Sequence, residues 1–364
     1  MDVYFASARV REFRKWWLPE ESLVQKMEKL FFSARLNKLV SKGDNVGLKL
    51  HVGEPGNVHY LRPIYASKLV DILKELGGRV SVIETSGLGT VPGRTSVAKH
   101  LEAARKNGFC ETTLGAPFVM VDGEDGLDSV DVKGIPVARG IVELDLLIVL
   151  SHVTGHIQAG FGGALKNLGV GCVSKAGKFR VHHKDRPRID KKLCNVCREC
   201  ISICPAGAIS EELEIGGACV LCGSCVDVCE KEAIKTELNP RRELSKRIGE
   251  NAAGVARAIS NKAGYINLLM DVIPHCDCHP HSDIPIVPDI GILVSSDPVA
   301  IDQASIDLVN STLGVVGSEA EATNAMAAGA DKFELINPGT DWQMQLKTAE
   351  ELGLGRREYR LKED

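Results

Sequence analysis

The chain has 364 residues, of which 44% are hydrophobic and 25% charged, a composition typical of a soluble globular protein with a large core domain and a small one. Only 5% of the residues are aromatic and the formal net charge is −4. The chain therefore offers few aromatic side chains to stack on bases and no excess of basic ones to bind phosphates, so no nucleic-acid partner is expected. The apolar run Leu146–Leu150 is too short to span a bilayer and the N-terminus resembles no signal peptide, which predicts a cytoplasmic protein without a membrane partner.

Strand and helix patterns alternate along the first part of the chain. The expected strands are Asp2–Ser7, Asn45–Val52, Arg79–Glu84, Pro117–Asp122 and Asp145–Leu150, and the expected helices are Pro19–Val40, Pro63–Leu76 and Ser96–Asn107. The strand–helix–strand order predicts a parallel sheet, in which the apolar run Leu146–Leu150 is a buried central strand. Residues 123–140 are predicted to form a loop or short antiparallel strands.

A glycine-rich loop, G87-L-G89-T-V-P-G93, lies between an expected strand and the next expected helix. Such a loop can cradle a phosphate at a helix N-terminus. Here the third glycine comes one place late for a dinucleotide fingerprint, and Pro92 intervenes. An ordinary connecting loop is therefore the favoured interpretation.

Polar residues gather directly after the buried strand, in the segment Ser151–Cys172. Open α/β sheets bind ligands at the carboxyl ends of their strands, so this cluster is predicted to be a site. His152 and His156 could bind a metal or transfer protons, and Lys166 could hold an anionic substrate. The alternative is that each histidine is simply a buried, hydrogen-bonded side chain.

Two cysteine runs, C194-x2-C-x2-C-x3-C204 and C219-x2-C-x2-C-x3-C229, repeat each other at an offset of 25 residues. This is the bacterial ferredoxin pattern, in which three cysteines hold one cluster and the fourth reaches the other. The predicted ligands are Cys194, Cys197, Cys200 and Cys229 for one [4Fe–4S] cluster, and Cys219, Cys222, Cys225 and Cys204 for the other. Structural zinc is the alternative, but it usually takes two separated pairs of ligands.

The α/β pattern stops near Lys175 and resumes after the cysteine runs. The later expected strands are Tyr265–Val272 and Asp289–Val294, and the expected helices are Arg242–Asn261, Pro298–Asn310 capped by Asp297, Glu319–Ala328 and Gln343–Leu352. The predicted fold is thus an α/β domain with a mostly parallel sheet, formed by residues 1–186 and 239–364 and interrupted by an inserted α+β ferredoxin-like domain at 187–238. Eight Lys and Arg residues between 175 and 192 are interpreted as electrostatic compensation of the clusters.

A second dense group of ligand side chains is H275-C-D-C278, which follows the strand expected at Tyr265–Val272. His275, Cys276 and Cys278 are predicted to form an additional metal site, and Cys276 is also a candidate catalytic residue. A solvent-facing loop and a redox dithiol are the alternatives.

Four motifs carry a resemblance to a known family: H51-V-G-E-P-G-N57, G162-G-A-L-K-N-L-G-V-G-C172, H275-C-D-C278 and P288-D-I-G-I-L-V-S-S-D-P-V-A-I-D-Q303. The chain resembles the iron–sulfur-binding members of the domain-of-unknown-function family 362. The resemblance covers nearly the whole chain and includes the ferredoxin-like insertion at the expected place.

A remoter resemblance is to the nickel-pincer lactate racemases. In that family a histidine is followed ten residues later by a lysine that carries the cofactor, and H156-I-Q-A-G-F-G-G-A-L-K166 has similar spacing. The resemblance implies that His156 is a ligand and Lys166 a cofactor anchor, and it implies a shared fold. The family also has a histidine after an earlier strand, whereas the loop G89-T-V-P-G-R94 has none.

These features predict a redox enzyme of unassigned substrate that transfers electrons through two [4Fe–4S] clusters to a small-molecule or metal site in the α/β domain. Electrons would come from a redox partner protein or a small-molecule donor. One alternative is an electron carrier without chemistry of its own, which leaves His156 and Lys166 without roles. Another is a maturation or sulfur-transfer factor in which Cys172, Cys276 or Cys278 carries sulfur or metal.

Overall fold

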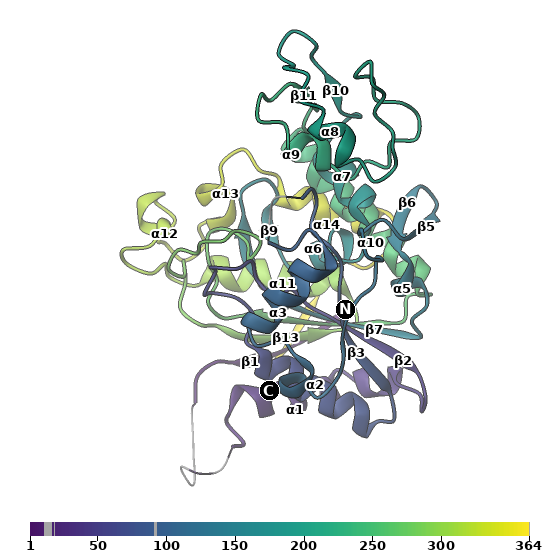
Figure 1. Cartoon of the computed structure of the whole chain (residues 1–364). Coiled ribbons are helices and arrows are strands. Elements are labelled where there is room, and N and C mark those ends of the chain that lie inside the picture. The colour runs from purple at the N-terminus through teal and green to yellow at the C-terminus, as the bar shows by residue number, and fades with distance from the viewer. Residues whose placement is uncertain (11–16, 18, 91–92, 364) are drawn as a thin grey trace.

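The fold is built on one eight-stranded sheet, seen edge-on in the computed structural model of Figure 1, which describes residues 1–10, 17, 19–90 and 93–363. The strand order is β14-β1-β13-β12-β7-β2-β3-β4. The strands are β1 (Asp2–Ser7), β2 (Asn45–Lys49), β3 (Arg79–Glu84), β4 (Phe118–Met120), β7 (Leu146–His152), β12 (Ala263–Leu269), β13 (Gly291–Ser295) and β14 (Arg360–Glu363). From β12 to β4 every neighbouring pair is parallel, and β13 is antiparallel to both of its neighbours.

Helices cover both faces of the sheet, because the central strand β7 is apolar on both sides. Leu146, Ile148 and Leu150 pack with α1 and α2, while Leu147 and Val149 pack with α6, α10, α11 and α14. The longer helices are α1 (Leu23–Ser33), α2 (Pro63–Glu75), α3 (Val97–Lys106), α7 (Lys175–His182), α10 (Arg241–Ala258), α11 (Pro298–Ser311) and α14 (Trp342–Glu351). The short ones are η1 (Leu36–Leu39), α4 (Glu111–Leu114), α5 (Arg139–Val142), α6 (Ala164–Gly169), α12 (Glu319–Ala322) and α13 (Lys332–Ile336).

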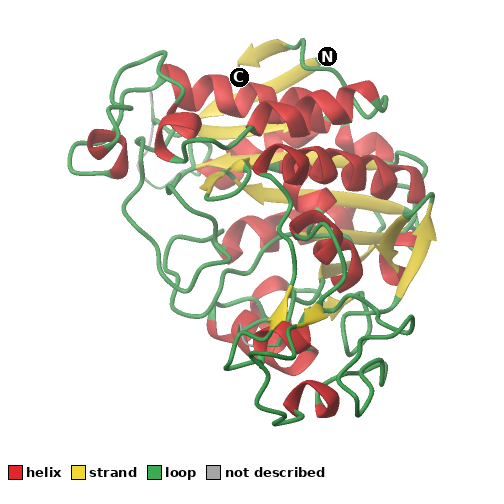
Figure 2. Ribbon diagram, turned by 90° about the horizontal axis from the view of Figure 1, so that it is seen from above, coloured by secondary structure: helices red, strands yellow, loops and turns green. Residues whose placement is uncertain are grey.

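Small hairpins and the paired chain ends complete the α/β part. The region 123–140 contains the antiparallel pair β5 (Ser129–Val132) and β6 (Ile135–Ala138), and a second pair is β8 (Thr154–His156) and β9 (Gly160–Gly162). β1 and β14 pair in parallel at one edge of the sheet, so the first and last strands of the chain are neighbours, near the N and C labels of Figure 2. The mixed α/β fold with a mostly parallel sheet is therefore confirmed.

Two predicted helices were too long, and local backbone geometry explains both. The helix expected over 19–40 begins only at Leu23, where the Ser22 hydroxyl caps it, and ends before Arg35, whose φ of +60° breaks the helix ahead of η1. The helix expected over 319–328 is the single turn α12, followed by Asn324 at φ +59°. In contrast, Asp297 caps α11 as expected by accepting N–H groups of Val299 and Ala300.

The segment with the cysteine runs projects from the α/β part, at the top of Figure 1. It contains β10 (Arg188–Ile189), α8 (Glu199–Ser202), α9 (Ser224–Asp227) and β11 (Ile234–Lys235), around a small core of its own that includes Ile209 and Ile234. Its ends are adjacent, because β10 pairs with β11 and His183 bridges to Leu238. An insertion whose ends meet disturbs its host little.

The repeat at an offset of 25 residues is also present in the backbone. α8 and α9 start and end 25 positions apart, and left-handed residues recur in the pairs Val196/Leu221, Arg198/Gly223 and Gly207/Glu232. The Ala208 and Ala233 N–H groups make equivalent bonds to the Cys204 and Cys229 sulfurs, at 3.3 and 3.2 Å. The two halves of the segment thus have matching local conformations.

Replacing residues 190–237 by a short Gly/Ser linker should leave the α/β part folded, because its two large core clusters contain no residue of this segment. We expect near-native far-ultraviolet circular dichroism and one cooperative thermal transition. The matched control removes the β5–β6 hairpin, whose Ile135, Val137 and Ala138 belong to the main core, and should unfold the protein. Aggregation of the linker variant, or two separate transitions, would refute the predicted boundaries.

Candidate functional site

A cavity of about 220 Å³ lies where four neighbouring parallel strands, β12, β7, β2 and β3, end. Because parallel strands deliver their carboxyl ends to one edge of a sheet, the loops that follow them meet there. The residues predicted from sequence that line this cavity are His152, His156, Lys166, Cys276 and Cys278. The convergence of Lys166 with the loop that contains Cys276 is therefore present in the structure.

Two buried ion pairs, which the sequence analysis missed, form part of the cavity wall. Lys49 Nζ lies 2.9 Å from Glu84 Oε2, and Arg94 Nε lies 2.7 Å from Glu54 Oε2. Burial raises the pKa of Glu84, but Lys49, His100 and Arg94 together outweigh burial and the net pKa is lowered. Other missed lining residues are His51, Lys178 and His182. Their position at strand ends was the available signal, since Glu84 is the last residue of β3 and His51 follows β2.

Lys166 is presented by the short helix α6, whose start is held by a buried carboxylate. Asp302 accepts the N–H groups of Ala164 and Leu165 at 2.7 and 2.8 Å, and burial raises the Asp302 pKa to about 6. Burial lowers the pKa of Lys166 to about 8, and the Asp277 charge opposes this shift. No hydrogen-bond or ion-pair partner of Lys166 Nζ occurs within the part of the chain that the structure describes, so the amine is available to a ligand.

His152 is an anchoring cation and not the free ligand that was predicted. Its Nδ1 lies 2.9 Å from Asp277 Oδ1, and its Nε2 lies 2.8 Å from the Met270 carbonyl oxygen. Both ring nitrogens face acceptors, so both carry protons and neither has a lone pair for a metal. Burial lowers the pKa of His152, but the Asp277 carboxylate outweighs burial and raises it.

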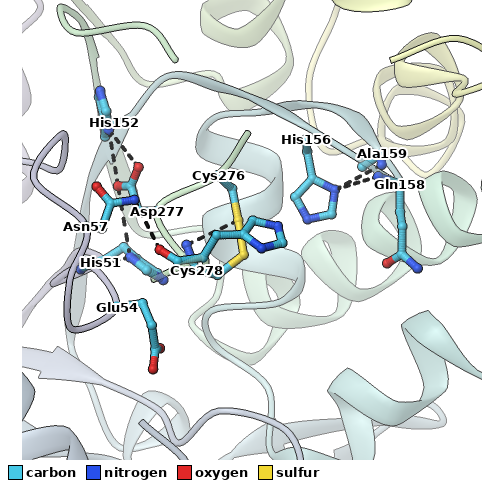
Figure 3. The surroundings of a disulfide bond; sticks show 12 residues. His51, Glu54, Asn57, His152, His156, Gln158, Ala159, Cys276, Asp277 and Cys278 are labelled. Atoms are coloured by element: carbon cyan, nitrogen blue, oxygen red, sulfur yellow. Dashed lines mark hydrogen bonds and ion pairs between the residues drawn. A yellow bond between two sulfur atoms is a disulfide. The ribbon is translucent and has the colours of Figure 1, made fainter. Parts of the chain in front are cut away.

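Cys276 and Cys278 form a disulfide beside His156, between that ring and the His152–Asp277 pair (Figure 3). The two sulfurs and a His156 ring nitrogen lie within 4.8 Å of one another, which makes them a candidate metal site after reduction. The expected third ligand, His275, does not line the cavity, and His156 takes its place. The local loop could not reveal this, because His156 lies 120 positions away in sequence.

The motif His51–Asn57 is hydrogen-bonded to the loop that contains the disulfide. The Glu54 N–H donates to the Asp277 carbonyl at 2.8 Å, and Asn57 Nδ2 donates to the His279 carbonyl at 3.2 Å. Gly56 approaches the Pro280 carbonyl so closely that a Cβ there would lie 2.5 Å from its oxygen, and its φ is +99°. These two motifs, distant in sequence, are thus one structural unit.

The second cysteine set surrounds a small cavity of about 20 Å³ that is lined by Cys204, Cys219, Cys222 and Cys225. This is the crossed combination predicted for one cluster. Burial and the neighbouring thiols raise the pKa of Cys225 to about 12, as expected for thiols that need a metal to lose their protons. Two cysteine sulfurs bound to the same tetrahedral zinc ion lie about 3.8 Å apart, because each Zn–S bond is about 2.3 Å long. Among the described residues, only His156, Cys276 and Cys278 gather three ligand atoms within 4.8 Å.

The cysteine segment touches the large cavity through the glycine-rich loop. Gly89 N–H donates to the Cys222 carbonyl at 3.1 Å, and Gly87 and Leu88 line the cavity. Val91 and Pro92 of this motif lie outside the described residues. Two of the eight basic residues between 175 and 192, Lys175 and Lys178, are buried and donate hydrogen bonds to Gly89 and Thr85. These two lysines are therefore part of the packing around the cavity.

Cys172, one of the predicted sulfur carriers, is fully buried, and burial raises its pKa to about 12. A thiol of this kind is a poor nucleophile at neutral pH. The structure therefore gives no support to Cys172 as a carrier of sulfur.

The sequence matches the domain of unknown function DUF362 over residues 46–307, which is more than half of the chain. The chain belongs to the DUF362 family. Among solved structures, this DUF362 protein is similar to the lactate racemase apoprotein from Thermoanaerobacterium thermosaccharolyticum, with 15% sequence identity and a TM-score of 0.38. The similarity covers 74% of this chain and 51% of that one, so the chain spans about half the length of that racemase.

No curated protein matches this DUF362 chain. Within the described residues, none of the helices has the length and apolarity needed to cross a membrane.

Asp277→Asn should destabilise the DUF362 protein by about 3 kcal/mol, because it leaves the buried His152 imidazolium without its counter-charge. Denaturant unfolding of the apoprotein measures the loss. Asp271→Asn is the matched control, since its pair with Arg62 is half exposed and should cost less than about 1 kcal/mol. Equal losses in the two variants would show that the His152–Asp277 pair is not a buried ionic anchor.

Lys166 should react with small acylating reagents faster than exposed lysines near pH 8, because about half of its amine is neutral at its pKa of about 8. Competitive labelling read by peptide mass spectrometry measures this reactivity. Lys178 is the control, because its pKa is also lowered to about 8 but its amine donates to Thr85 and Val173. Labelling of Lys166 at the rate of surface lysines would contradict a lowered pKa.

Proposed function

We propose that this DUF362 protein is an iron–sulfur redox enzyme that delivers electrons to the cavity at the strand ends. Cys194, Cys197, Cys200 and Cys229 would hold one [4Fe–4S] cluster, and Cys204, Cys219, Cys222 and Cys225 the other. When bound, such clusters supply one-electron transfer at low potential. The bond from Gly89 to the Cys222 carbonyl is the observation that carries the proposal, because it joins a cluster ligand to a loop of the cavity wall.

The burial of the cysteines suggests a direction for the transfer. Cys197 is exposed, whereas Cys222, whose carbonyl accepts the N–H of Gly89 in the cavity wall, is buried. A redox partner protein or small-molecule donor would therefore approach the set that contains Cys197, in a reducing cytoplasm that keeps these thiols free. Electrons would then leave through the set that contains Cys222.

The cavity suits an anionic small-molecule substrate. Lys166 offers an unpaired amine, and His51 Nδ1 accepts the Gly53 N–H at 3.1 Å, which leaves its proton on Nε2. Arg94 and Lys49 add positive charge that Glu54 and Glu84 balance. Together Lys166 and His51 could bind an anion and stabilise charge that develops during its reduction.

Protein reconstituted without oxygen should contain roughly eight irons and eight acid-labile sulfides per chain, since each cubane holds four of each. Cys197→Ser and Cys222→Ser should each lose about half of the iron, because each removes a ligand of a different cluster. Cys110→Ser is the matched control and should keep all of it, since Cys110 is a free thiol outside both runs. Zinc at about one ion per four cysteines, without sulfide, would refute the proposal.

A further inference from the structure

The Cys276–Cys278 disulfide is distinct from every other cysteine in the described chain. The other ten cysteines are free, including all eight predicted cluster ligands. A bridge between residues only two positions apart removes little entropy from the unfolded chain, so stability does not account for it. In a reducing compartment, disulfides are mostly catalytic or redox-sensing.

The surroundings of the disulfide are suited to charge that appears when its bond breaks. Cys276 Sγ accepts the N–H of Cys278 at 3.3 Å, a contact that would stabilise a thiolate at Cys276. The negative Asp277 between the two cysteines is neutralised by His152 at 2.9 Å. Lys166 lines the same cavity and has no partner among the described residues.

The ring of His156 lies beside the two sulfurs, and its hydrogen bonds fix which ring nitrogen carries the proton. Its Nδ1 accepts the N–H groups of Gln158 and Ala159 at 3.2 and 3.0 Å, so the neutral ring carries its proton on Nε2. Burial, reinforced by the charge of Lys166, holds the pKa of His156 well below its usual value, which keeps the ring neutral. A ring in this tautomer can donate a hydrogen bond to a thiolate, but it offers no lone pair at Nε2 to a metal.

The disulfide is also linked to the cysteine segment. Glu54 donates its N–H to the Asp277 carbonyl, and its side chain binds Arg94 and accepts the N–H of Gly93. Thus one residue joins the disulfide loop to the glycine-rich loop that contacts Cys222. The number of electrons needed also equals the number available, because reduction of a disulfide takes two electrons and two clusters can supply one each.

We propose that Cys276–Cys278 is a redox-active disulfide, reduced by the two [4Fe–4S] clusters with Lys166 as the proton donor. This inference rests on the proposed function. In the step, the S–S bond takes up two electrons and breaks, and each cluster is oxidised by one electron. Cys276 leaves as a thiolate that accepts bonds from Cys278 N–H and His156 Nε2–H. The ammonium of Lys166 gives its proton to Cys278, which becomes a thiol, and Lys166 becomes a neutral amine.

Anaerobic reductive titration of the full-length, cluster-loaded protein measures how many electrons each chain takes up. Starting from oxidised protein, the wild type should consume about four electron equivalents per chain, two for the clusters and two for the disulfide. Cys276→Ser and Cys278→Ser should consume about two, with unchanged iron content and visible spectrum. Cys110→Ser is the matched control and should still consume about four. Alkylation and mass spectrometry should find two new thiols on the peptide with residues 276–278 only after reduction.

The variant Lys166→Arg tests proton donation by Lys166 separately from the uptake of electrons by the disulfide. Arginine keeps the positive charge but does not release a proton. The variant should still consume about four equivalents, while the thiols at 276 and 278 appear about a hundredfold more slowly near pH 7. Unchanged rates in Lys166→Arg would overturn the role of Lys166.

Two results of the titration would overturn the redox disulfide. If the clusters are intact but the wild type consumes only about two equivalents, the disulfide is not their acceptor and the proposed function stands without it. A stoichiometric zinc or nickel ion that stays bound in the oxidised protein would likewise show a metal site in place of a disulfide. Absence of iron and sulfide would instead overturn the proposed function, and this inference with it.

Discussion

Four neighbouring strands, β12, β7, β2 and β3, run parallel through the middle of this protein, and the rest of the structure depends on that arrangement. Parallel strands require crossover connections, so every loop that follows them emerges at the same edge. Segments near residues 51, 85, 152 and 276 therefore meet around one cavity, although more than 200 positions separate the first from the last. Helices on both faces bury the apolar strands and keep this edge free for polar groups.

Paired buried charges give the cavity a defined shape. Lys49 with Glu84, Arg94 with Glu54, and His152 with Asp277 each join two segments that are distant in sequence. Such pairs contribute little net stability, because desolvation offsets their attraction, but losing one partner is expensive. They therefore hold loops in place. Lys166 differs from these cations because it has no counter-ion among the described residues, and its lowered pKa suits proton transfer.

The cysteine segment is hydrogen-bonded to a loop of the cavity wall. Its Cys197 is exposed, and its Cys222 carbonyl accepts the N–H of Gly89 in the glycine-rich loop. The same cavity is lined by the Cys276–Cys278 disulfide, where Cys276 Sγ accepts the N–H of Cys278. The proposed function assigns a one-electron donor, a two-electron acceptor and an anion-binding lysine to one cavity, and these are the parts that a reductase requires. An electron carrier alone would need only the first of them.

The sequence by itself determined whatever depends on local spacing. The cysteine repeat, the apolar run of β7, the Asp297 cap and the alternation that leads to a parallel sheet all arise from neighbouring residues. Only the tertiary structure decided which distant groups meet. It paired His152 with Asp277, placed His156 where His275 was expected beside Cys276, and buried Lys178 of the basic stretch. The physical reason is that hydrogen bonding and burial set the protonation and availability of each side chain, and both depend on partners that come together only when the chain folds.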